Sequence, residues 1–168
     1  MKKIAWILCF ATLISLLCAC GSKKMEYKVP TNFYYIAKDI SYNSPAGVIC
    51  AEVREGISYY GNLTVFLRDY LQGPESSDLQ TYIPAGTEMR SCTISGDEAT
   101  LTFSEEFSKL NGSRLSVVSG ALLLSSHDFA NINTVIIRVE NGTLDDKDEL
   151  CMTMDDLVLM DSVETAAE

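Results

Sequence analysis

The chain of 168 residues has little positive charge and a single histidine. Its 13 lysines and arginines stand against 23 aspartates and glutamates, a formal net charge of −10. Because contacts to nucleic-acid phosphates require clustered lysine and arginine, this balance argues against a nucleic-acid partner. Any Ser-His-Asp arrangement would have to use His127. Its position beside Asp128, near the end of an expected helix, better fits an interaction with the negative helix C-terminus, so we expect no catalytic residue and no enzyme.

Patterns that hold metals or phosphates are also missing from the sequence. There is no CxxC pair, and no cysteine lies at metal-ligand spacing from His127. The acidic run 145–149 lacks the spaced oxygens, the central glycine and the terminal glutamate of a calcium loop, so a solvated acidic linker is favoured. Gly56 and Gly61 do not form the glycine-rich pattern that cradles phosphates. We therefore expect neither a metal nor a cofactor.

The one long apolar run lies at the N-terminus. Lys2 and Lys3 precede residues 4–17, which are apolar except for two hydroxyl residues. The length and the charged flank are typical of a secretory signal rather than of a membrane-spanning helix. The sequence Leu-Cys-Ala-Cys-Gly-Ser that follows resembles a bacterial lipoprotein signal, in which a diacylglyceryl group is attached to a cysteine and the chain is cut before it. Cys20 is the expected lipidated residue because Ala19 is small; an ordinary export signal with a chance cysteine is the alternative.

Processing at Cys20 would give a chain held by lipid on the extracytoplasmic face of the cell membrane. We expect residues 1–19 to be the signal peptide and residues 20–31 a lipidated tether. The processed chain keeps 11 basic and 23 acidic side chains, a net charge of −12, and ten of the acidic ones lie in residues 140–168. A polybasic contact with the membrane is therefore not expected, and the lipid would carry the anchoring.

Three cysteines remain beside Cys20 in the processed chain. Cys50 and Cys92 each lie in an expected strand, where small buried thiols are common. A disulfide between these two residues is the alternative, which an exported location would permit. Cys151 completes an odd number, so no full disulfide framework is expected.

Residues 32–144 predict one domain, which is long enough to bury a core without disulfides. Alternating and β-branched segments indicate strands, and apolar residues at helical spacing, beginning at Leu63 behind the capping residue Asn62, indicate helices. Gly120 within the second helix predicts close packing against the sheet. The fold class is α+β, with order β-β-α-β-β-α-β and two helices on one face of a small, mostly antiparallel sheet. The expected strands are 32–37, 48–54, 87–94, 98–103 and 134–139, and the expected helices are 63–71 and 113–128.

Four sequence segments resemble the GerM N-terminal domain, usually called GerMN. The first helix closes with Leu-Gln-Gly-Pro, ending at Gly73 and Pro74, and Ile-Pro-Ala-Gly-Thr follows, with Pro84 and Gly86. The strand 99–103 leads into Ser-Glu-Glu-Phe, and an apolar helix and strand before Asn-Gly complete the order. The resemblance covers residues 32–144 and implies structural roles for these glycines and prolines. It also implies a relation to sporulation and germination lipoproteins and a fold like that of ring-building domains of envelope assemblies.

An acidic extension follows the domain at residues 145–168. Residues 150–160 are too apolar for a free acidic tail. We expect them to pack back on the domain as an extra strand or short helix and to cover a sheet edge that would otherwise invite pairing.

The aromatic residues suggest where a partner binds. Tyr34 lies in a strand whose alternate residues face outward, and Tyr59 and Tyr60 lie in a loop, so these three form the candidate contact surface. The leading hypothesis is a non-enzymatic interaction module at the membrane that helps to assemble an envelope complex, through an envelope protein or through self-association. The alternative is a ligand-binding lipoprotein that recognises a cell-wall glycan or peptide in a tyrosine-lined groove.

Overall fold

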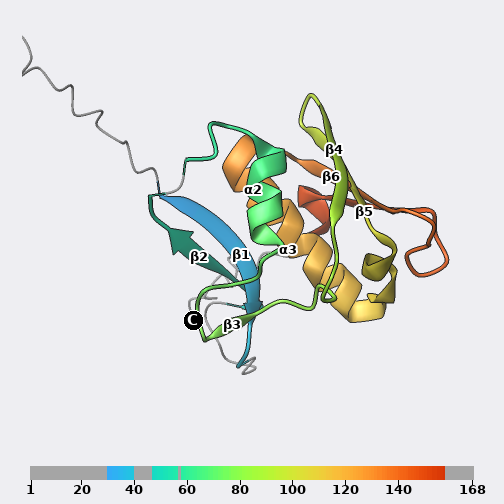
Figure 1. Cartoon of the computed structure of the whole chain (residues 1–168), viewed down its shortest axis with the longest axis horizontal. Coiled ribbons are helices and arrows are strands. Elements are labelled where there is room, and N and C mark those ends of the chain that lie inside the picture. The colour runs from blue at the N-terminus through green and yellow to red at the C-terminus, as the bar shows by residue number, and fades with distance from the viewer. Residues whose placement is uncertain (1–29, 40–46, 57, 158–168) are drawn as a thin grey trace, which may run out of the picture.

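A computed structural model describes residues 30–39, 47–56 and 58–157 (Figure 1). The expected lipidation site Cys20 and residues 20–29 of the expected tether lie outside the described residues, while Thr31, the last residue of that tether, already belongs to β1. The five strands and two helices expected from the sequence are present, with bounds within two residues of expectation. The elements in chain order are β1 (Thr31–Ala37), β2 (Ile49–Arg54), α2 (Leu63–Tyr70), β3 (Leu79–Gln80), β4 (Met89–Ser95), β5 (Glu98–Phe103), the 3-10 helix η1 (Glu105–Lys109), α3 (Gly112–Ala130), β6 (Thr134–Val139), β7 (Glu149–Thr153) and the 3-10 helix η2 (Met154–Asp156).

The strands form two sheets, so the expectation of a single sheet with both helices on one face is wrong. One sheet has the order β2-β1-β3 and the other the order β4-β5-β6-β7. Every strand pair is antiparallel except β5 with β6, so the sheets are mostly antiparallel, as predicted. Strand β1 pairs with β2, and β4 pairs with β5, so each of these pairs joins consecutive strands. Helix α3 lies between the two sheets (Figure 1). A helix in that position prevents the two strand sets from joining.

The central position of α3 explains why it is buried on several sides rather than along one stripe. The helix contacts β1, β6, β7 and α2. Three serines are completely buried in it, and the hydroxyl of each donates to the carbonyl oxygen four residues earlier, at 2.7 to 2.8 Å. These bonds satisfy polar groups that would otherwise destabilise a buried helix. The serines are Ser119, Ser125 and Ser126.

The first sheet and α2 share an aromatic core. Phe33 and Tyr35 of β1 are fully buried and face Phe66 and Tyr70 of α2, with ring centroids 4.6 Å apart in each facing pair. Phe129 of α3 stacks on Phe66 at 4.3 Å. Close aromatic pairs of this kind add stability beyond the area they bury. They hold both helices against β1.

The region that begins at Glu149 pairs with the domain. Strand β7 lies antiparallel to β6, with Met152 opposite Val135 and Leu150 opposite Ile137, and therefore covers the edge that β6 would otherwise expose. The sequence predicts an extra strand or short helix within residues 150–160, and the structure has β7 followed by η2. Residues 158–168 lie outside the described residues.

Gly120 marks a close approach, as its position in the sequence suggested. A Cβ atom built on Gly120 would lie 3.1 Å from Leu157 Cδ2 and 3.4 Å from Ile49 Cδ1. Segments from both ends of the domain thus meet over this one residue of α3. No helix in the described part of the chain is long and apolar enough to cross a membrane.

Candidate interaction surface

The glycines and prolines quoted from the sequence form two turns. Gly73 lies in the turn that follows α2, with a positive φ of 88°, and its N–H donates to the Tyr70 carbonyl at 3.0 Å just before Pro74. Pro84 and Gly86 form the turn that leads into β4, where the φ of Gly86 is 84°. The N–H and hydroxyl of the next residue, Thr87, both donate to the Pro84 carbonyl, at 3.1 and 2.8 Å. All four residues therefore shape the backbone.

A buried ion pair fixes the first of these turns. The Arg54 side chain is 5% exposed and donates to Glu52 Oε1 at 2.7 to 2.8 Å and to the Gly73 carbonyl at 2.7 Å. Its guanidinium also lies over the ring of Phe33, 4.2 Å from the centroid. The second carboxylate oxygen of Glu52 accepts the N–H of Ser76 at 2.7 Å. The pair thus connects β2 with both sides of the Gly73 turn.

Arg54 also lies 3.5 Å from Asp69 Oδ2 and 3.7 Å from Glu75 Oε1, so a single guanidinium serves three carboxylates. Burial alone would raise the pKa of Glu52, but the bonds from Ser76 and Arg54 outweigh it and hold the pKa below its ordinary value of 4.5. Burial raises the pKa of Tyr35, whose hydroxyl donates to the Tyr70 carbonyl at 2.8 Å. In the described part of the chain, every buried side-chain polar atom has a hydrogen-bond partner. The hydrogen bonds of Arg54 and Glu52 thus hold β2 against the turn after α2.

Sequence reasoning missed Glu52 and Arg54 because they reverse the usual pattern of a strand. Val53 between them is 58% exposed, whereas Glu52 is 9% and Arg54 is 6% exposed. The signal available in the sequence was the spacing of two opposite charges two residues apart, which places both on one face of a strand.

The three tyrosines of the candidate contact surface have different environments. Tyr60 is 94% exposed. Tyr59 is only 5% exposed, with its ring packed edge-on against Phe66 and its hydroxyl bonded to Asp69, so its assignment to the contact surface is wrong. The Tyr59 ring is part of the aromatic core, where burial against other rings is more favourable than exposure to solvent. Tyr34 is half-buried beside α3. The tyrosines therefore do not form a shared groove.

The remaining chemically suggestive residues have structural partners. His127 lies in the last turn of α3, and its Nδ1 is 3.1 Å from the carbonyl oxygen of Ile132, just after the helix. Asp145, from the acidic run, accepts the N–H of Gly112 at 3.0 Å and caps the N-terminus of α3, where a carboxylate is favourable. This acidic run is therefore more than a solvated linker. Within the described ranges, no group of three or more potential ligands could hold a metal ion.

The cysteines do not form the alternative disulfide. Cys50 in β2 and Cys92 in β4 belong to different sheets, and each is half-buried. Burial raises the pKa of the Cys92 thiol, while a hydrogen bond with Thr64 opposes that shift. Cys151 in β7 is exposed.

Strand β4 is an edge strand with mostly exposed side chains, and α2 lies near it. This strand is at one end of the second sheet, pairs with β5 on one side and has no strand neighbour on the other side among the described residues. Of its seven residues only Met89 is buried, and Ile94 is 49% exposed. An exposed edge strand presents backbone donors and acceptors to a further strand.

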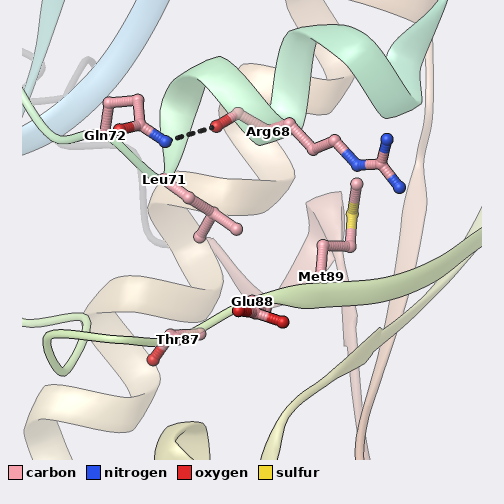
Figure 2. A pocket seen from close by; sticks show the side chains of 6 residues that line it. All are labelled: Arg68, Leu71, Gln72, Thr87, Glu88 and Met89. Atoms are coloured by element: carbon pink, nitrogen blue, oxygen red, sulfur yellow. Dashed lines mark hydrogen bonds between the residues drawn. The ribbon is translucent and has the colours of Figure 1, made fainter.

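One pocket lies where α2 meets the beginning of β4 (Figure 2). Its volume is about 320 Å³, and Arg68 of α2 and the two residues that follow the helix, Leu71 and Gln72, line it above the chain entering β4. The Gln72 amide donates to the Arg68 carbonyl at 3.4 Å. The other lining residues are Thr87, Glu88 and Met89. The pocket contains no tyrosine, so it is not the groove expected for a glycan or peptide ligand.

These features define the class: a two-sheet α+β domain with a buried ion pair that stabilises its turns and an open strand edge. The family model described as Germane, sporulation and spore germination, matches residues 32–145. The chain belongs to this family. No curated protein matches the chain.

Two solved structures show the same fold. The tandem GerMN domains of the sporulation protein GerM from Bacillus subtilis align with a TM-score of 0.51 and 19% identity over 74% of this chain; the chain spans 43% of that structure. The first GerMN domain of GerM from Bacillus subtilis aligns with a TM-score of 0.51 and 18% identity, over 68% of this chain and 84% of the domain. This chain is therefore similar to one GerMN domain.

Proposed function

We propose that the chain is a non-enzymatic interaction module, anchored by lipid on Cys20 at the extracytoplasmic face of the cell membrane. Its role is to help assemble or stabilise an envelope complex related to sporulation or germination. Membership of the Germane family supports the biological setting. The lipoprotein-like signal before Cys20 supports the location, because a short apolar stretch followed by a small residue and a cysteine suits export and lipid attachment.

The observation that carries the proposal is the open edge of β4. Six of its seven residues are at least partly exposed, and the long outer side has no paired strand in the described part of the chain. Addition of a strand from a protein partner would satisfy these backbone groups, and the side chains would provide specificity. The partner is an envelope protein or a second copy of the chain.

A lysine on this edge tests the proposal. Ile94→Lys places a charge on β4, where it disfavours strand addition. Val53→Lys is the matched control, because Val53 is also an exposed β-branched residue on an edge strand, in the other sheet. We expect affinity capture from detergent-solubilised membranes to lose its partners with Ile94→Lys and to retain them with Val53→Lys. Loss with Val53→Lys alone would contradict the assignment to β4.

The location is tested separately by membrane fractionation. The wild-type chain should sediment with membranes and Cys20→Ala should not, provided that both are exported. Sedimentation of Cys20→Ala with membranes to the wild-type extent would contradict anchoring through Cys20.

A further inference from the structure

The loop between β2 and α2 holds one tyrosine away from the rest of the domain. Tyr60 is 94% exposed and has a φ of 51°, in the left-handed region that a bulky residue seldom adopts. Holding a tyrosine in this conformation costs on the order of 1 kcal/mol, and such local strain concentrates at functional sites. An aromatic ring exposed in this way buries no surface in the isolated domain.

Neighbouring contacts keep this part of the loop in place. Tyr59 is buried against Phe33, Phe66 and Phe129. The Asn62 N–H donates to the Tyr59 carbonyl at 2.8 Å, which closes a tight turn around Tyr60 and Gly61. The turn is thus attached to the aromatic core on one side and to the start of α2 on the other. Tyr60 is presented by a fixed support.

The same end of the molecule receives the N-terminal segment. Thr31, at the beginning of β1, pairs with Arg54, at the end of β2, so the loop after β2 begins beside the point where the chain enters β1. Figure 1 shows the start of β1 and the loop leading into α2 at one end of the first sheet. The C-terminal part of α3 is also at this end, because Asn32 donates to Asp128 at 2.8 Å.

We infer that Tyr60 inserts its ring into the interfacial layer of the lipid bilayer and orients the domain on the membrane. This inference rests on the proposed lipid anchoring at Cys20. The eleven peptide steps from Cys20 to Thr31 can span at most about 40 Å, a bound set by backbone geometry alone. The end that carries Tyr60 is therefore held near the bilayer, where the apolar ring and polar hydroxyl of tyrosine are favoured together.

The contact is confined to this side chain. Glu55 and Asp128 are exposed at the same end, and their charges disfavour a broad contact with anionic lipid. A protein partner that covers Tyr60 is the competing outcome of the test below.

A tryptophan replacing Tyr60 reports its surroundings. The chain has one tryptophan, Trp6, within the expected signal peptide 1–19, so Tyr60→Trp would be the only tryptophan of the processed protein. Tyr82→Trp is the matched control: Tyr82 lies beside Arg114 near the other end of α3, 5.1 Å from guanidinium carbon to ring centroid. Each lipidated variant is reconstituted into phosphatidylcholine vesicles with ordinary or dibrominated acyl chains, because bromine quenches tryptophan only at short range.

We expect the emission of Tyr60→Trp to move to shorter wavelength on reconstitution and to be quenched by brominated lipid, while Tyr82→Trp keeps its emission. Equal quenching of both variants, or no quenching of either, would overturn the inference. A shift of Tyr60→Trp that requires added membrane proteins and is insensitive to bromine would assign Tyr60 to a protein contact instead. If both variants associate with vesicles but neither is quenched, the anchor at Cys20 is supported and the Tyr60 contact alone is wrong. If neither variant associates with vesicles, both the anchor and the contact are wrong.

Discussion

The Arg54 guanidinium connects three parts of the domain: β1, β2 and the turn after α2. It lies between Glu52, the carbonyl of Gly73 and the ring of Phe33, and only 5% of its side chain is exposed. A buried charge without its partner is much more costly than a surface charge without one. The stability of the α2 turn should therefore depend on this pair.

Removal of the arginine provides the first prediction. Arg54→Ala should lower the free energy of unfolding by about 3–5 kcal/mol, because Glu52 would remain buried without a cation. Arg90→Ala is the control: Arg90 is half-exposed and pairs with Glu88 and Glu140 at the surface, so its loss should cost at most about 1 kcal/mol. Urea unfolding followed by circular dichroism measures both. Equal losses would contradict the role of Arg54.

The pH dependence of stability provides the second prediction. The pKa of Glu52 is lowered in the folded protein, so as the pH falls the unfolded chain takes up its proton first and folding loses this contribution. The stabilisation is fully present above the ordinary glutamate pKa of 4.5 and disappears as the pH falls through the lower folded value. The difference in unfolding free energy between wild type and Glu52→Gln should therefore be larger at pH 7 than at low acidic pH. An unchanged difference across this range would contradict it.

At the residue scale, the sequence predicts a role correctly where the residue contacts its near neighbours in the chain. Asn62 was expected to cap α2, and its side-chain oxygen accepts the Val65 N–H at 3.2 Å. The burial of Tyr59 could not be derived in the same way, because its ring contacts Phe129, seventy residues away in the chain. Such contacts depend on how distant elements are brought together.

At the scale of elements, Gly120 permits the close packing of α3 against β2 and the chain after β7. Gly120→Val should destabilise the domain by about 1–3 kcal/mol, because the added atoms would meet Leu157 and Ile49. Ser116→Val, at an exposed position of the same helix, controls for the helix propensity of valine and should cost a few tenths of a kcal/mol. Thermal unfolding compares the two. A similar melting temperature for both variants would show that the contact over Gly120 adapts without cost.

Strand β7 is predicted to protect the edge of β6. Truncation after Gly142 should lower the melting temperature or cause aggregation, because β6 would become an exposed apolar edge. Truncation after Asp148 isolates this effect, since it keeps buried Leu144 and the Asp145 cap of α3 and removes β7. Calorimetry and light scattering measure both outcomes. An unchanged melting curve for both truncations would contradict the role of β7.

The helices and the five longer strands were predictable because their patterns are local. The helical spacing of apolar residues predicts α2, and the alternation of apolar and polar residues in β5 predicts the buried face of its hairpin with β4. The two-residue strand β3 gave no such signal, because Leu79 and Gln80 form a strand only through pairing with β1. The division into two sheets also depends on α3 lying between distant segments, which no local pattern specifies.

At the scale of the whole molecule, the two sheets and α3 leave β4 without a strand neighbour on its outer side, among the residues that the structure describes. With Cys20 as the proposed anchor, the domain would bind its partner close to the membrane.

Affinity capture from detergent-solubilised membranes, comparing wild type with Cys20→Ala, tests this central claim most directly. Both forms carry the same β4 edge, so a difference between them reports the contribution of the tether alone. The wild-type chain should retain envelope proteins that the soluble Cys20→Ala form does not retain. Identical partners in equal amounts from the two forms would contradict the account, because engagement would then not depend on attachment to the membrane.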